Sequence, residues 1–155
     1  MTNKESIITG AMIILVTYTL GLSLVNQAFP AVQTTQTLSS TGAIQIQTTA
    51  GIGVYSDSQC NTPLTSVSWG TLVAGESKNV ICFIKNEGSS ATTLSLETSN
   101  YSPTAAENYL DLSWNYNGNA INPDGVVYIM LTLNVDSNIE GVTTFSFDIT
   151  IVGST

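Results

Sequence analysis

The sequence contains no histidine and few charged side chains. Of its 155 residues only 9% are charged, with 3 basic and 11 acidic side chains and a formal net charge of −8. Soluble proteins usually carry about 25% charged residues. Nucleic-acid binding needs Lys and Arg to neutralise phosphates, so the composition excludes that class of partner. Without histidine and with only two cysteines, the chain also lacks the usual ligands of a zinc or copper centre.

The missing histidine limits the available catalytic chemistry. A serine nucleophile would need lysine as its base, and Lys78 and Lys85 stand at the two ends of one expected strand with no nucleophile-elbow pattern nearby. Glu107 and Asp111 are the pair of carboxylates to consider for glycoside cleavage, but the sequence predicts no aromatic cleft around them. We therefore expect no enzyme, no cofactor and no small-molecule substrate.

One loop offers oxygen ligands in an alternating pattern. Asp136, Asn138 and Glu140 occupy every second position of a segment between two expected strands. Calcium prefers carboxylate and amide oxygens, but the rest of a calcium-loop pattern is missing. A polar turn explains the same residues, so the sequence predicts no metal site.

The N-terminal part is apolar. The segment Ser6–Val25 has no charge and no proline, and as a helix it would rise roughly 30 Å, enough to cross a bilayer core. Three interpretations remain open: a cleaved secretory signal, an uncleaved membrane anchor, and a helix that leaves the membrane to pack in the core of a filament. A secretory signal has a basic residue before its apolar run, and Lys4 supplies one. Cleavage after Ala28 would require a small residue at position 26, which is occupied by Asn26. All three place the rest of the chain outside the cytoplasm.

The remainder has the alternation of half-buried strands. We predict a mainly β protein with three parts: an N-terminal hydrophobic α-helix over 1–27, a Thr/Gln/Ser-rich linker or donor strand over 28–42, and one antiparallel immunoglobulin-like β-sandwich over 43–155. Asn117-Gly118 is the strongest hairpin signal between the strands. Alternating apolar residues predict eight strands, in the segments 43–47, 51–57, 65–70, 78–86, 92–98, 109–116, 126–136 and 143–152.

Two features of this part suit an extracellular protein. Cys60 and Cys82 are the only cysteines, and outside the cytoplasm a pair is most simply a disulfide. The competing interpretation is a buried free thiol at Cys82 and an exposed one at Cys60. Asn100-Tyr101-Ser102 is the only glycosylation sequon, so Asn100 is a candidate for an N-linked glycan.

The run from Gly53 to Val152 resembles small archaeal surface proteins, in which a hydrophobic N-terminal segment precedes one immunoglobulin-like domain. It includes a turn, strand and turn element that recurs in extracellular sandwich modules, formed by Gly75, Ser77, Val80, Asn86 and Gly88. The layout of apolar helix and Thr/Ser/Asn-rich sandwich is similar to archaeal type IV pilins and archaellins. Glu5 resembles the acidic residue near the start of mature pilins, whereas the letters NKESII depart from the usual cleavage pattern.

The resemblance implies a structural subunit of an extracellular filament. It would be held in the membrane by its helix before assembly, and its main partner would be a second copy of itself. Two alternatives remain: a solitary anchored or secreted domain that binds a partner at the cell surface, and a fibre in which 34–46 completes the sheet of the next subunit. In the filament interpretation the helix packs through small and apolar residues, namely Ile7, Ile8, Gly10, Ala11, Met12, Ile13, Leu15, Val16, Leu20, Gly21, Leu22 and Leu24.

Overall fold

The computed structural model describes residues 37–40, 44–49 and 51–155. The hydrophobic helix predicted over 1–27, with all its proposed packing residues, lies outside the described residues. Within the described ranges, no helix is both long and apolar enough to span a membrane.

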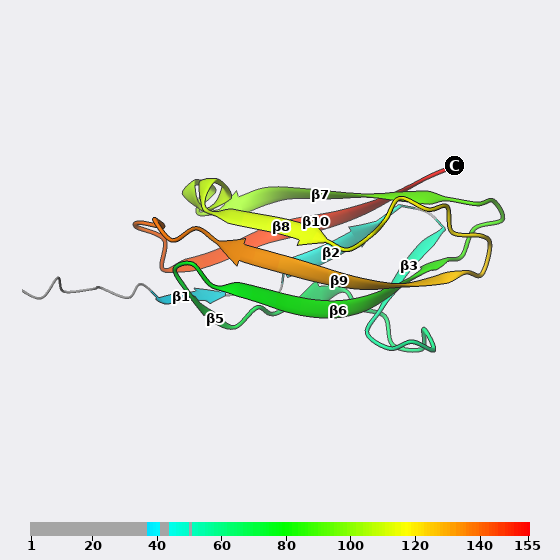
Figure 1. Cartoon of the computed structure of the whole chain (residues 1–155), viewed down its shortest axis with the longest axis horizontal. Helices are drawn as coiled ribbons and strands as arrows, with labels where there is room; N and C mark the ends of the chain where they lie inside the picture. Colours follow the sequence, from blue (N-terminus) through cyan, green and yellow to red (C-terminus); the bar gives the residue numbers. More distant parts are fainter. Residues whose placement is uncertain (1–36, 41–43, 50) are drawn as a thin grey trace, which may run out of the picture. The chain divides into compact units, whose positions relative to one another are not determined.

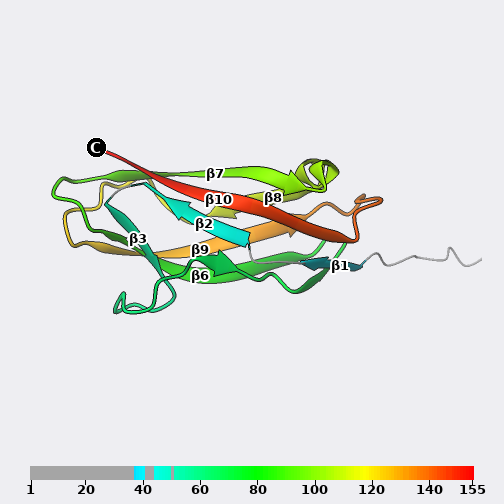
Figure 2. The same cartoon turned by 180° about the vertical axis from the view of Figure 1, so that it is seen from behind.

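The described part of the chain is mainly β, as predicted, and forms two sheets that face each other (Figures 1 and 2). A short 3-10 helix, η1 (Thr104–Asn108), precedes the strand that begins at Leu110. One sheet contains β3 (Ile52–Tyr55), β6 (Ser77–Asn86), β9 (Val126–Val135) and β8 (Leu110–Trp114), in that order and with antiparallel pairing. The other contains β1 (Thr37–Ser40), β2 (Ile44–Thr48), β4 (Ser66–Val67), β5 (Thr71–Val73), β7 (Thr93–Ser102) and β10 (Thr144–Ser154).

The second sheet is built around the C-terminal strand. Along one edge, β10 pairs antiparallel with β7, while its other edge pairs with β1 and β2, both parallel to it. β5 then pairs antiparallel with β1, and β4 pairs with β2. The sandwich is therefore not purely antiparallel, because the two N-terminal strands run in the same direction as the C-terminal one.

The strand order also differs from the expected immunoglobulin arrangement. In that fold the last two strands are neighbours in one sheet, whereas here β9 and β10 belong to different sheets. The chain crosses between the sheets after Val135, in the connection that contains Ile139 and Val142, both buried. Alternation predicts strands but not the sheet to which each one belongs, so the sandwich was predictable and its strand order was not.

The N-terminal boundary of the sandwich also needs correction. Of the segment 28–42, predicted as a linker or donor strand, the structure describes only β1, and β1 pairs with both β5 and β10 of its own chain. Leu38 in β1 is fully buried and lies opposite Leu72 of β5. The predicted tight hairpin at Asn117-Gly118 is replaced by a longer connection over 115–125, in which Ile121 forms a bridge with Thr92.

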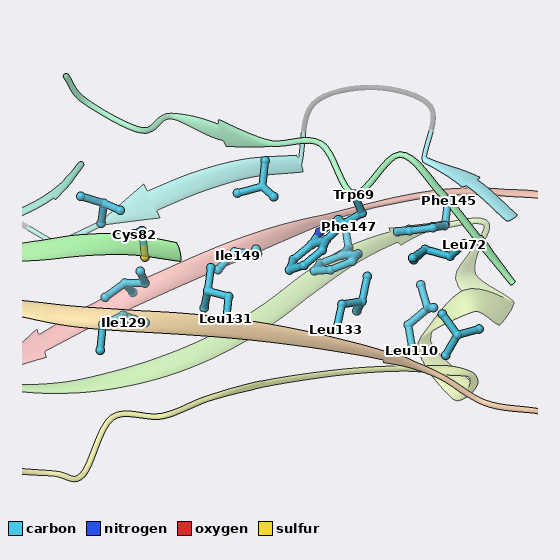
Figure 3. Close-up of a cluster of buried hydrophobic side chains, with 14 of the residues drawn as sticks. Trp69, Leu72, Cys82, Leu110, Ile129, Leu131, Leu133, Phe145, Phe147 and Ile149 are labelled. Carbon is cyan, nitrogen blue, oxygen red and sulfur yellow. The ribbon is translucent and has the colours of Figure 1, made fainter. Parts of the chain in front are cut away.

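The core fills the space between the two sheets (Figure 3). The inward side of each long strand supplies apolar side chains in alternation, as the period of two requires. Trp69 is the largest side chain in the core, and Phe145 and Phe147 of β10 stack with an interplanar angle of 16°. The largest side chains that are fully buried are Trp69, Phe145, Phe147, Leu38, Leu72, Ile84, Ile129, Leu131, Leu133, Ile149 and Ile151.

Candidate functional site

The recurring Gly75 to Gly88 element has a structural role at both ends of β6. Gly75 has φ +78°, a left-handed conformation that suits glycine in the turn before the strand. At the other end Asn86 is fully buried. Its Nδ2 donates to the carbonyls of Ser90 at 2.7 Å and Ile121 at 2.8 Å, and its Oδ1 accepts from Gly88 N at 2.9 Å. This amide therefore ties β6 to two loops, so the element stabilises the fold.

The predicted disulfide is not formed, because both cysteines are free thiols in the structure. Cys82 lies opposite Ile129 and its sulfur points into the core (Figure 3). Cys60 lies in the loop after β3, where the nearby charges that act on its thiol include Lys85 and Glu87. Lys85 is on the outward side of β6 and Cys82 on the inward side, so the sheet separates the two sulfurs.

The two thiols should differ sharply in reactivity. Burial raises the pKa of Cys82 to about 11, and burial followed by the charge of Asp57 raises the pKa of Cys60. Since thiolates are the reactive species and Cys82 is inaccessible, we expect iodoacetamide to label Cys60 alone in the native protein and both residues in denaturant. Peptide mass spectrometry measures this directly. Labelling that requires prior reduction would instead demonstrate the disulfide.

The lysines and the carboxylates considered for catalysis do not lie in one common site. Lys85 forms an ion pair with Asp124 at 3.5 Å, in which the side chain of Lys85 is partly exposed and that of Asp124 is largely exposed. Lys78, seven positions earlier on the same strand, is on the opposite side of the sheet. Glu107 and Asp111 line one shallow hollow together with Asp136, at the end of the sandwich where η1 lies.

The loop considered for calcium is a compact turn. Asp136 Oδ1 accepts hydrogen bonds from the backbone N of Asn138 at 2.7 Å and from its Nδ2 at 3.1 Å. Within the described ranges, no cluster of three or more acidic or cysteine side chains is arranged to hold a metal ion.

The glycosylation candidate Asn100 is exposed on β7, at an irregularity in the pairing with β10. It has φ +55°, and its Nδ2 donates to Asp148 Oδ2 at 2.7 Å. Glycosylation of Asn100 remains a prediction.

A further ordered feature is the loop that carries Cys60. The carboxylate of Asp57 accepts hydrogen bonds from the backbone N–H groups of Gln59 at 3.0 Å, Asn61 at 3.2 Å and Thr62 at 2.7 Å. These bonds, the one from Asn61 first, lower the pKa of Asp57 below its ordinary value. One side chain thus holds the loop in a closed turn.

Acid should open this loop. The pKa of Asp57 is lower in the folded loop than in the unfolded chain, where it is about 3.9. The hydrogen bonds of the Asp57 carboxylate therefore stabilise the loop fully above that pH, and this stabilisation is lost as the pH falls through the pKa of the folded state. We expect the amide NMR signals of Asn61 and Thr62 to shift together below about pH 4. Asp57→Asn should lack this transition, and amides that do not respond to acid would contradict the assignment.

The surface with the most distinctive chemistry was not predicted. The outward side of the four-stranded sheet carries an apolar patch that we define by Tyr55, Ile81, Phe83, Val126, Tyr128 and Met130. Three large hydrophobic residues are exposed in the described part of the chain, and all three belong to this patch. Their exposed fractions are 50% for Ile81, 46% for Val126 and 47% for Tyr128. The signal was present in β6, where Ile81 and Phe83 alternate with inward-facing Cys82 and Ile84, so this strand is apolar on both sides.

The patch is held in place by its neighbours. Phe83 lies directly opposite Tyr128 in the register, and their rings meet edge to face at 5.9 Å. Tyr55 lies opposite Phe83 on the other side, and its hydroxyl donates to the carboxylate of Glu87. That hydrogen bond, with burial and the charge of Glu87, raises the pKa of Tyr55 above its ordinary value.

Comparison with models of known protein families gives no match, and a search of curated proteins finds no match either.

Proposed function

We propose that the chain is a structural subunit of an extracellular filament, of the kind that archaeal pili represent. One observation carries the proposal: the charge-free apolar segment Ser6–Val25 precedes a self-contained β-sandwich. A segment of this length and composition needs either a membrane or other apolar helices around it. In the filament the segments pack together in the core, and the sandwiches form the outer shell.

The exterior of the sandwich supports this role. The outward positions of β7 and β10 carry mainly hydroxyl side chains, including Thr93, Ser95, Ser146 and Thr150. Such a surface is hydrated without a high density of charge, which suits a shell that contacts solvent on one side and neighbouring subunits on the other.

A charge in the apolar segment tests the proposal. We expect Leu15→Glu to abolish filaments of the purified full-length chain in electron micrographs, because a carboxylate is costly among apolar helices. Leu15→Ile is the matched control and should assemble normally. Circular dichroism should show that both variants keep the β-sandwich. If the wild-type chain gives only monomers or small closed oligomers, the filament proposal fails and a solitary surface domain takes its place.

Strand donation is the second candidate, because β1 has an unusual position. It lies between β10 and β5, which do not pair with each other, and it inserts Leu38 into the core. A β1 supplied by a neighbouring copy could satisfy the same pairing. Deletion of residues 1–27 separates the candidates: filaments that survive the deletion support donation, and their loss supports a helical core.

A further inference from the structure

We propose that the apolar patch binds a second copy of this chain, with the patch of one copy packed against the patch of the other. The inference rests on the proposed function only because adjacent filaments would bring copies of the chain together at high local concentration. The patch has an apolar half, where Ile81 lies opposite Met130 and Phe83 opposite Tyr128. Beyond it the same face becomes polar, with Asn79 opposite Thr132 and Ser77 bonded to Asn134 at 2.6 Å.

The distribution of apolar surface identifies the counterpart. Burying exposed apolar area is favourable only against another apolar surface. In the part of the chain that the structure describes, every large hydrophobic residue that is exposed belongs to this patch. Among the described residues, the surface of a second copy that complements the patch is therefore the same patch.

Charge supports the same conclusion. Two copies of a chain with net charge −8 repel each other unless they meet on a neutral surface. On the outward side of β3, β6, β8 and β9 the charged strand residues are Lys85 and Asp111, which have opposite signs. Two loop carboxylates lie at the edge of the patch, where Glu87 accepts from Tyr55 and Asp124 pairs with Lys85. The outward side of β7 and β10 carries Glu97 and Asp148 instead, so contact through that side would bring carboxylates together.

The patch is also preorganised for binding. It is built on β6 and β9, which pair continuously from Ser77 to Lys85, so little backbone order is lost when a partner docks. The aromatic residues Tyr55, Phe83 and Tyr128 occupy its centre, and aromatic side chains are enriched among the residues that dominate binding energy.

The symmetry of the contact determines where it can act. A surface that pairs with itself is related by a two-fold axis, whereas successive subunits along a polar filament are related by a screw and meet through different surfaces. The patch is thus expected to join two chains side by side, within a dimer or between adjacent filaments, and not to link successive subunits along one strand.

Cysteine cross-linking of the full-length chain tests the contact. In a Cys60→Ser background, Tyr128→Cys places a thiol near the centre of the patch, and Ser95→Cys places one on the outward side of the other sheet as a matched control. Under mild oxidation we expect disulfide-linked dimers from Tyr128→Cys and at least about tenfold fewer from Ser95→Cys, because only the patch brings identical positions together. Equal yields would overturn the inference.

A charge variant provides an independent measurement. Ile81→Glu would place two carboxylates against each other across the contact, so the dissociation constant of the dimer in mild detergent should rise by more than about tenfold. Ser95→Glu is the control with the same added charge and should leave it unchanged. Tyr128→Thr, which keeps a strand-forming residue, should weaken the dimer even if Ile81→Glu fails to fold.

The outcomes separate this inference from the proposed function. Filaments with no cross-link through position 128 would overturn the patch contact and leave the filament role intact. Cross-linked dimers that never form filaments would support the patch contact and contradict the filament role. Docking of the patch onto phosphatidylglycerol vesicles, with no self-association, would overturn the inference in favour of a lipid surface.

Discussion

Replacing Asn86 by aspartate is expected to lower the free energy of unfolding at neutral pH by about 3 to 5 kcal/mol. The Nδ2 group of Asn86 donates to two carbonyl oxygens, of Ser90 at 2.7 Å and of Ile121 at 2.8 Å. A carboxylate would direct a negative oxygen at both carbonyls in a fully buried position. Domains typically have a total stability of about 5 to 15 kcal/mol, so this substitution should remove a large part of it.

The effect should depend on pH in a way that identifies its cause. Burial beside carbonyl oxygens would raise the pKa of the introduced carboxyl group in the folded Asn86→Asp variant, since both favour the neutral acid. The folded state then binds more protons than the unfolded state, so the variant should lose stability as pH rises from below about 4. Asn86→Ala leaves the same carbonyls without donors, and we expect a loss of about 3 kcal/mol that does not vary with pH in this way.

Urea unfolding at pH 4 and pH 7 measures both variants. If the stabilities of Asn86→Asp and Asn86→Ala change in parallel between the two pH values, a buried charge is not the cause of the loss in Asn86→Asp. An Asn86→Ala variant as stable as the wild type would contradict the role given to the hydrogen bonds of Asn86.

Trp69→Ala should have an effect of similar size for a different reason. Trp69 is fully buried in the core, and truncation of a buried aromatic residue to alanine typically costs about 3 to 5 kcal/mol through lost contacts and the remaining cavity. Within the described residues, the indole Nε1 is buried without a hydrogen-bond partner. Trp69→Phe removes this unpaired N–H and keeps most of the ring, so it should lose less than half as much as Trp69→Ala.

Urea unfolding followed by far-ultraviolet circular dichroism gives both values without relying on the fluorescence of the residue being replaced. A phenylalanine variant as unstable as the alanine variant would mean that the indole N–H forms a hydrogen bond in solution that contributes to stability.

The predictable part of the fold is the part that alternation encodes. All eight predicted segments contain a strand, because each has apolar residues at every second position and turn residues at its ends. β1 and β5 were not predicted as packed strands. The letters TLSS of β1 hold a single apolar residue and the letters TLV of β5 hold two consecutive ones, so neither strand shows alternation. Their pairing places Leu38 opposite Leu72, which is distant in the sequence.

The candidate sites show the same limit. Alternation with Val80 and Ile84 already predicts that Cys82 faces inward, but nothing in the loop sequence around Cys60 indicates on which side of the sheet that loop lies. The disulfide prediction came from the expected compartment and not from geometry. The apolar patch was accessible from the sequence, since Ile81 and Phe83 occupy the second face of a strand whose first face is already apolar.

Helical reconstruction of the full-length assembly by electron cryomicroscopy tests the central claim most directly. The account predicts filaments in which the density for 6–25 forms a bundle along the axis and each sandwich lies outside it. Filaments whose axis lacks that density and whose subunits are joined through β1 would contradict the helical core. A preparation that yields only monomers or closed oligomers would contradict the filament itself.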